Sequence, residues 1–123
     1  MQKKILIVDD EPNIVMSLEY SFKKQDYEVF IARDGSEALH ILETQIPDVV
    51  LLDIMMPNVD GYQTLKHIKE NSRTQNIKVV FLSAKNKASD IEIGLTLGVD
   101  KYLTKPFSVK KVIAEITELL NNA

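Results

Sequence analysis

Three aspartates follow apolar segments of this 123-residue chain, at points where strands would end. Asp9 and Asp10 come directly after the apolar run 5–8, and Asp53 comes directly after the apolar run 49–52. If the two runs are neighbouring parallel strands, the three carboxylates meet at one edge of a sheet and repel one another. A divalent cation would remove that repulsion. An all-oxygen set with few protein ligands suits Mg²⁺, which keeps several waters and favours phosphate oxygens.

Two further polar side chains follow the later apolar segments. Ser83 comes after the segment 78–82, and Lys105 comes shortly after the segment 101–103. A serine hydroxyl can hydrogen-bond a phosphoryl oxygen, and a lysine ammonium supplies a compact positive charge. Taken singly, each aspartate could be a helix cap or a loop acid, and Ser83 a turn residue. Together with a metal they describe a phosphoryl site in which an aspartate is the nucleophile.

The segments that carry these residues alternate between strand-like and helical patterns. The runs 5–8 and 49–52 are entirely apolar, which is typical of strands covered on both faces. Regular alternation implies right-handed crossovers and a parallel sheet whose carboxyl ends share one edge. The sequence therefore predicts an α/β fold, a doubly wound five-stranded parallel sheet with helices on both faces. The predicted strands are residues 4–8, 28–32, 48–53, 78–82 and 101–103.

Helix-start signals lie between the predicted strands. Pro12 suits a first helical turn. Asp34 and Glu37 resemble a capping box, in which a carboxylate at each end accepts from the backbone of the first turn. The other predicted starts are Asp60-Gly61 and, for the last helix, Ser108.

One helical segment does not have a single apolar face. Ile91, Ile93, Leu95 and Leu97 alternate along it, and residues two apart in a helix point in different directions. They cannot all face the core, so at least one is predicted to belong to an apolar surface for a partner. The alternative is a single exposed apolar residue, which proteins tolerate.

The composition is that of an ordinary globular protein, with 45% hydrophobic and 27% charged residues. We expect one domain, residues 1–123. The formal net charge of −3 argues against nucleic acid as a direct ligand, and no apolar run approaches the roughly 20 residues that span a bilayer. Zero cysteines exclude disulfides and thiolate catalysis. With no export signal visible, a cytoplasmic protein without membrane contact is expected.

The motifs together closely resemble a response-regulator receiver domain, over essentially the whole chain. They are Asp9-Asp10, Asp53 with Pro57 and Gly61 after it, Ser83-Ala84, and the segment from Tyr102 through Lys105-Pro106 to Phe107. The resemblance is to the chemotaxis-regulator-like receivers of two-component systems. It implies a flavodoxin-like sheet with the strand order 2-1-3-4-5.

Carried to this sequence, the resemblance implies a role for each site residue. Asp53 is the phosphoacceptor, Ser83 the switch hydroxyl and Tyr102 the aromatic that changes rotamer. Lys105 is the phosphate-binding lysine, and the Lys105-Pro106 bond is implied to be cis. The implied Mg²⁺ ligands are Asp10, Asp9 directly or through water, Asp53 and the backbone carbonyl of Met55.

The resemblance also implies a function, a phosphorylation-dependent switch rather than a conventional enzyme. A sensor histidine kinase, a phosphotransfer protein or a small phosphodonor would supply the phosphoryl group. The domain would catalyse only its own phosphorylation and dephosphorylation, and Met55 and Lys85 would flank the acceptor. The last two helices and the strand between them would then form the surface that controls a downstream protein. The chain would be either a stand-alone regulator or a receiver excised from a longer protein.

A dimer through those elements is less expected. DNA-binding relatives pair charged residues there, and the corresponding positions in this chain are Lys101, Glu115, Ile91 and Lys111. Compared with those relatives, two of these positions carry the opposite charge. Another pair is broken, because one of its positions is not charged. The chain is expected to be a monomer or a phosphorylation-dependent dimer, the latter if the reversed pair still meets.

Other functions fit the residues less well. An aspartyl phosphatase would place a second acid two residues after the nucleophile, where this chain has Met55. A flavodoxin-like nucleotide binder would need a phosphate loop where this chain has Asp9-Asp10-Glu11. A scaffold independent of phosphorylation would not need every chemical position filled. His40 and His67 lie in helical segments away from the strand ends, so the phosphodonor histidine is expected on a partner.

Overall fold

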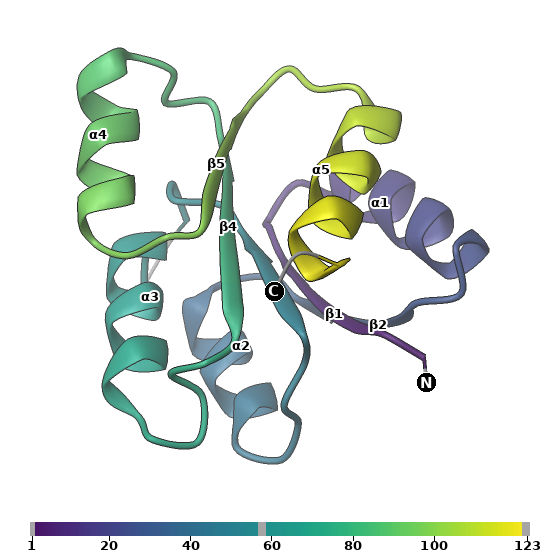
Figure 1. Ribbon diagram of the computed structural model, residues 1–123, viewed down its shortest axis with the longest axis horizontal. Helices are drawn as coiled ribbons and strands as arrows, with labels where there is room; N and C mark the ends of the chain where they lie inside the picture. Colours follow the sequence, from purple (N-terminus) through teal and green to yellow (C-terminus); the bar gives the residue numbers. More distant parts are fainter. Residues whose placement is uncertain (1, 57–58, 122–123) are drawn as a thin grey trace.

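The computed structural model describes residues 2–56 and 59–121, so Pro57 lies outside the described residues. A five-stranded parallel sheet in the order β2-β1-β3-β4-β5 forms its centre, which confirms the predicted fold and strand order (Figure 1). The strands are β1 (Lys4–Val8), β2 (Glu28–Ala32), β3 (Val49–Leu52), β4 (Lys78–Ser83) and β5 (Lys101–Thr104). The helices are α1 (Pro12–Lys24), α2 (Gly35–Leu42), α3 (Gly61–Glu70), α4 (Ala88–Thr96) and α5 (Val109–Asn121).

Two helical layers cover the sheet. Figure 1 shows α1 and α5 together on one face and α2, α3 and α4 on the other. On the first face, Leu18 and Phe22 of α1 pack with Ile116 of α5 against the buried side chains of the strands. On the second face, Leu42 of α2 and Leu65 of α3 do the same. Both faces of the central strands are therefore buried, which explains their uninterrupted apolar sequences.

The strand ends differ from the prediction by one residue at several places. The pairing of β1 with β3 runs from Ile5–Val49 to Val8–Leu52, so β3 is shorter than the predicted 48–53. The amide of Asp53 still donates to the Val8 carbonyl at 2.9 Å, after which the chain leaves the sheet. This last bond places Asp53 beside the end of β1.

The helix starts follow the predicted signals with one correction. Pro12 is at the start of α1, and the Asp34 carboxylate accepts from the Glu37 amide at 2.9 Å. The Glu37 carboxylate accepts from the amide of Arg33 at 3.0 Å, one residue before the cap, rather than from the amide of Asp34. A reciprocal capping box forms instead at α3, between Asp60 and Gln63. Ser108 accepts from the Lys111 amide at 3.4 Å.

Helix α4 is held differently from the other helices. Of its described residues, only Gly94 is buried. Ile93 and Leu95 are each 50% exposed, as is Leu97 just after the helix. This confirms that the alternating apolar residues do not all face the core. No helix among the described residues is long and apolar enough to cross a membrane.

Candidate functional site

The three aspartates of the sequence pattern meet at the carboxyl edge of the sheet. Asp9 follows β1 and Asp53 follows β3, its neighbour, and both are almost completely buried, at 3% and 5% exposure. Asp10 is exposed. One carboxylate oxygen of each lies within 4.8 Å of the others. The pairing of β1 with β3 therefore creates the predicted acidic cluster.

Lys105 reaches this cluster from the end of β5. Its amide donates to the Ser83 carbonyl at 2.8 Å, which continues the pairing with β4 and directs the side chain toward the acids. The Nζ atom donates to Asp9 at 2.9 Å, to Glu11 at 3.0 Å and to Asp53 at 3.3 Å. Burial alone would lower the pKa of Lys105, but the hydrogen bonds to Asp9 and Glu11 and the nearby carboxylate charges raise it above its usual range. Lys105 is therefore a permanent positive charge.

The Asp53 carboxyl is under opposing influences. Desolvation by burial raises its pKa, the Lys105 charge lowers it, and the Asp9 charge raises it again, with a net rise above the usual value. Its Oδ1 atom accepts from the Met55 amide at 3.3 Å. The side chain of Met55 is 58% exposed. The charged form of Asp53 is thus disfavoured by burial, and few groups hydrogen-bond its carboxylate.

These residues fit a magnesium ion. Three carboxylates offer oxygen ligands within one small region, and a single lysine does not balance their charge. Oxygen ligands of high charge density are those that Mg²⁺ prefers. The acidic cluster is therefore compatible with Mg²⁺ and with phosphorylation of an aspartate.

Ser83 and Tyr102 connect the site to α4. Ser83 is fully buried at the end of β4, and its Oγ accepts from the Lys85 amide at 3.3 Å. The half-buried Tyr102 donates its hydroxyl to the Lys85 carbonyl at 2.7 Å and packs edge-on against Phe81. Desolvation and nearby acidic groups raise the pKa of Tyr102 to about 12. Both side chains therefore bond the same residue of the loop before α4.

Two backbone features support the site. The Lys105-Pro106 peptide bond is cis, the isomer that the resemblance implied. Gly61 begins α3 directly against the loop that follows Asp53, and its amide donates to the Ile54 carbonyl at 3.0 Å. A Cβ atom on Gly61 would lie 2.6 Å from the Asp53 carbonyl oxygen. Only glycine allows α3 to pack this closely behind Asp53.

Comparison with known proteins identifies the family of this chain. The family model of the response regulator receiver domain matches residues 5–117. The chain belongs to this family. A curated relative, the alkaline phosphatase synthesis transcriptional regulatory protein PhoP of Bacillus subtilis, is 41% identical over 123 residues, covering 100% of this chain and 50% of PhoP.

Solved receiver domains have the same structure. The receiver domain of the Francisella response regulator 1452 superposes with a TM-score of 0.91 at 34% identity and covers 98% of each chain. The BeF3-activated receiver domain of DrrB from Thermotoga maritima superposes with a TM-score of 0.89 at 29% identity, covering 98% of this chain and 99% of that one. The chain is a receiver domain of a two-component response regulator, a signalling domain that works with histidine kinases rather than a conventional enzyme.

The receiver domain spans about half the length of the curated relative that it matches. It also covers 54% of the longer DrrB response regulator.

One residue of the site was not predicted from the sequence. Glu11 occupies the N-cap position of α1 but makes no side-chain cap, and its carboxylate accepts from Lys105 instead. The signal for it was present, because Glu11 directly follows the two aspartates and no cap residue precedes Pro12. Glu11 gives Lys105 a third carboxylate partner.

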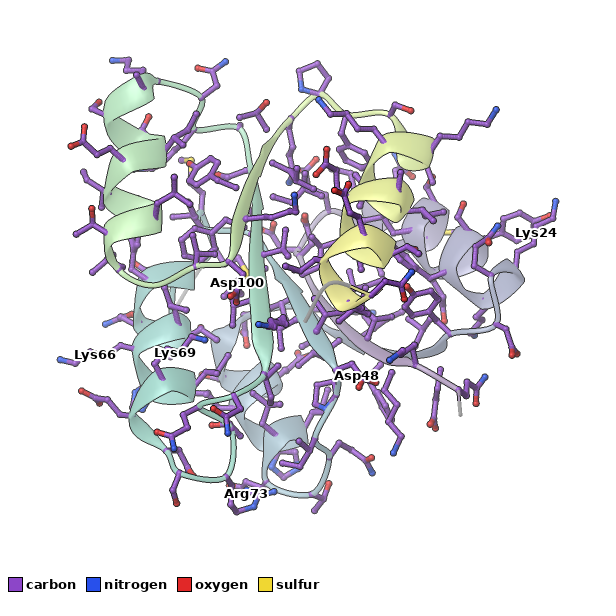
Figure 2. The ribbon with its side chains drawn as sticks, in the orientation of Figure 1. Lys24, Asp48, Lys66, Lys69, Arg73 and Asp100 are labelled. Carbon is purple, nitrogen blue, oxygen red and sulfur yellow. The ribbon has the colours of Figure 1, made fainter. Side chains whose placement is uncertain are left out.

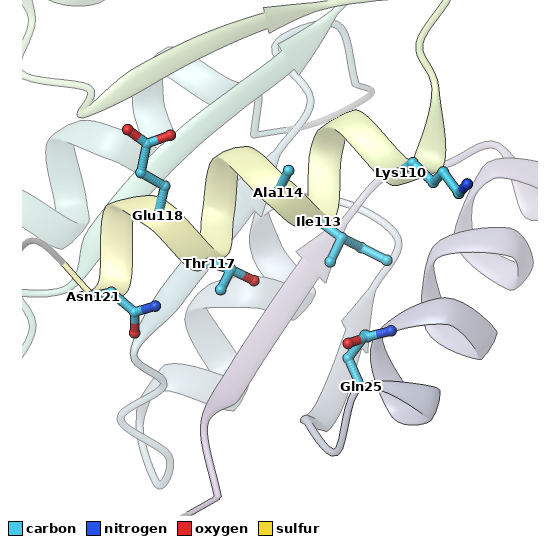
Figure 3. Close-up of a pocket in the computed structure, with 7 residues that line it drawn as sticks. All are labelled: Gln25, Lys110, Ile113, Ala114, Thr117, Glu118 and Asn121. Atoms are coloured by element: carbon cyan, nitrogen blue, oxygen red, sulfur yellow. The ribbon is translucent and has the colours of Figure 1, made fainter.

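The candidate histidines and a separate hollow lie away from this site. His40 and His67 are exposed on α2 and α3. The hollow, of about 580 Å³, lies between the end of α1 and α5 and is lined by Gln25, Lys110 and Thr117 among others (Figure 3). None of the sequence-predicted site residues lines it. The hollow is therefore separate from the acidic cluster at the carboxyl edge of the sheet.

Proposed function

We propose that this receiver domain is a phosphorylation switch in which Asp53 accepts the phosphoryl group. The observation that carries the proposal is the convergence of two buried carboxylates, Asp9 and Asp53, on the ammonium of Lys105. Helix capping or loop packing would require neither the burial of both acids nor a lysine from another strand. The donor would be the phosphohistidine of a sensor kinase or phosphotransfer protein, or a small phosphodonor.

The transfer requires the carboxylate form of Asp53. One of its oxygens forms a bond to phosphorus while the phosphorus–nitrogen bond of the donor breaks, and the electron pair of that bond stays on the imidazole nitrogen. Lys105, already 3.3 Å from Asp53, is placed to offset the negative charge of the transferring group. Hydrolysis of the resulting acyl phosphate by water would return Asp53 to its carboxylate.

The proposed Mg²⁺ ligands are Asp10, Asp53, the Met55 backbone carbonyl, and Asp9 directly or through water. Bound there, the metal would neutralise charge on the phosphoryl oxygens. The excess of carboxylates over cations in the cluster supports this assignment. Met55 provides no acid where an aspartyl phosphatase would need one, which favours a retained phosphoryl group over rapid turnover.

The switch itself would operate through Lys85. The phosphorylated Asp53 side chain would carry roughly −1.5 to −2 charges by analogy with other protein phosphates, more than the single charge of the carboxylate, and would attract Lys105 and the Ser83 hydroxyl. Ser83 now bonds the Lys85 amide and Tyr102 bonds the Lys85 carbonyl, so a movement of Ser83 changes the surroundings of Tyr102. Reversing a strongly biased two-state equilibrium needs about 5.5 kcal/mol, which charge-assisted hydrogen bonds and metal contacts can supply.

The output surface is proposed to be the face of α4, β5 and α5. It contains Tyr102 and the half-exposed Ile93 and Leu95. Lys101 and Glu115 form an ion pair of 2.8 Å within the chain, so the reversed charges do meet, but inside one protomer. A partner protein or a second copy would therefore bind here through apolar contacts more than through this pair.

Labelling with acetyl phosphate and Mg²⁺, followed by intact-mass measurement, tests the acceptor. The wild-type chain should gain the mass of one phosphoryl group, and Asp53→Asn should gain none. Asp48→Asn is the matched control, because Asp48 lies at the other end of the same strand and bonds the Lys4 amide. Equal labelling of the wild-type chain and Asp53→Asn would exclude Asp53 as the acceptor.

A further inference from the structure

A second surface lies between α3 and the end of α4, away from the acidic site. It is a groove of about 360 Å³ lined by one side of α3 and by Leu97. Leu65 lines it and is 1% exposed, whereas Leu97 is 50% exposed. The groove thus has a fixed apolar floor and an apolar wall that the rest of the described chain does not cover.

A packed aromatic ring forms the other wall of the groove. Tyr62, near the start of α3, packs edge-on against Phe81 of β4, with ring centroids 5.8 Å apart. The Nζ atom of Lys85 lies 5.9 Å from the centroid of the Tyr62 ring. A ring fixed by these contacts gives the groove a defined shape without any ordering on binding, which lowers the entropic cost of association.

The charges beside the groove are mainly positive. Lys66 and Lys69, labelled on α3 in Figure 2, line it, and Lys85 lies over the Tyr62 ring, whereas Glu70 is the one acid among the described residues that line it. Lys69 is engaged within the chain, because it donates to the Gln75 and Ile77 carbonyls at 3.4 and 3.2 Å and pairs with Asp100 at 3.9 Å, so the positive charge beside the groove comes from Lys66 and Lys85. Lys66 is exposed and forms no ion pair with any residue in the described part of the chain. Its charge is available to a partner.

We propose that this groove binds an acidic amphipathic helix of a partner protein. Apolar side chains on one face of the helix would cover Leu97 and fill the space beside Tyr62 and Leu65, in the manner of other helix-in-groove complexes. Acidic residues on its flanks would face Lys66 and Lys85. This surface is distinct from the proposed α4–β5–α5 output face, and the binding proposed is to the unphosphorylated chain.

The probe is a synthetic peptide of about 16 residues with leucines at positions i, i+3, i+4 and i+7 and glutamates on the flanks. It is titrated into the ¹⁵N-labelled chain, and amide shifts are followed by NMR. We expect the shifts to centre on Tyr62, Lys66 and Leu97. Binding should weaken as salt is added, because part of the attraction is electrostatic.

The three variants change exposed residues, so we expect each to fold, and a loss of peptide binding would report on the groove itself. Leu97→Asp should weaken peptide binding at least about tenfold, and Lys66→Glu about fivefold. Leu95→Asp is the matched control, because Leu95, two residues earlier in α4, is likewise a 50% exposed leucine but lies outside the groove lining, and binding should change less than about twofold.

Several results would overturn the proposal. They are shifts centred on another face, equal weakening by Leu95→Asp and Leu97→Asp, and equal binding of a peptide in which lysines replace the glutamates. Concentration-dependent self-association lost in Leu97→Asp, with no peptide binding, would assign the groove to a second copy of the chain instead. None of these measurements involves the phosphoryl group, so their outcome does not depend on whether Asp53 is the phosphoacceptor.

Discussion

Lys105 lies at the centre of the site. Its single positive charge is surrounded by more carboxylates than one cation can balance. It bonds Asp9, Glu11 and Asp53, and Asp53 is the most distant of the three partners. The unphosphorylated site therefore holds Lys105 mainly on acids that are not the proposed acceptor. A phosphoryl group on Asp53 would outcompete them, because it carries more charge and more acceptor oxygens.

The raised pKa of Asp53 predicts a stability cost that its removal would relieve. Because the folded chain binds this proton more tightly than the unfolded chain, stability is lost as pH rises from 3.8, the ordinary value, through the pKa in the fold. Without metal at pH 7, Asp53→Asn should be more stable than the wild-type chain by about 1 kcal/mol, a usual gain when a functional charge is removed. Urea unfolding in EDTA measures the difference.

The difference should shrink as pH falls below the pKa of Asp53, since both side chains are then neutral. Asp26→Asn is a control for loss of an exposed acid, and its effect should stay within about 0.5 kcal/mol at any pH. A variant Asp53→Asn that is no more stable than the wild-type chain at pH 7 would show that Lys105 fully offsets the burial.

At the scale of elements, strand pairing brings the site residues together and close helix packing holds them. The ends of β1, β3, β4 and β5 deliver Asp9, Asp53, Ser83 and Lys105 to one edge of the sheet. Helix α3 supports Asp53 from behind through Gly61, and α4 rests on Tyr102 through Gly94. A Cβ atom on Gly94 would lie 2.9 Å from the Tyr102 ring.

Gly61→Ala should therefore disturb the acceptor loop. The added methyl group would meet the Asp53 carbonyl oxygen and the Ile54 Cα atom, both at 2.6 Å, and neither is a flexible side-chain end. We expect a loss of about 1–3 kcal/mol in unfolding free energy, as for other overpacked sites, and slower labelling by acetyl phosphate. Urea unfolding and intact-mass kinetics measure the two effects. His67→Ala, an exposed change on the same helix, should alter neither, and a wild-type result for Gly61→Ala would show that α3 is free to shift.

Much of this arrangement could be predicted from the sequence, because strand ends are marked by a change from apolar to polar residues. Asp9, Asp53, Ser83 and Lys105 are visible on that basis. Glu11 was missed because its place after the two aspartates does not reveal its partner, and only the position of Lys105 in space shows that the two side chains bond. The packing of Gly94 on Tyr102 was also not predictable, since a glycine within a helix gives no indication of what lies opposite.

At the scale of the whole molecule, the acidic edge of the sheet and the helical layers are parts of one cooperative fold. The two hydrophobic clusters share the central strands, and the same strands end in the acidic site. A ligand that binds only the folded site must therefore stabilise the entire domain by linkage.

Mg²⁺ with beryllofluoride, the kind of ligand in the activated DrrB receiver domain, should raise the unfolding temperature of this chain. At about a hundred times its Kd the ligand would add roughly 2.7 kcal/mol, enough for a shift of several degrees. Thermal unfolding followed by circular dichroism provides the measurement. Asp53→Asn should respond only to the Mg²⁺, and an equal beryllofluoride response in that variant would place the ligand elsewhere.

The shallow attachment of α4 has a consequence for how such a domain could change over evolutionary time. Because only Gly94 of its described residues is buried, mutations on the remainder of the helix leave the core volume unchanged. Surface substitutions of that kind usually alter stability by less than about 0.5 kcal/mol. A gene duplicate could therefore acquire a different partner through changes in α4 while its phosphorylation chemistry stayed intact, so new signalling pathways could arise from one scaffold without passing through unfolded intermediates.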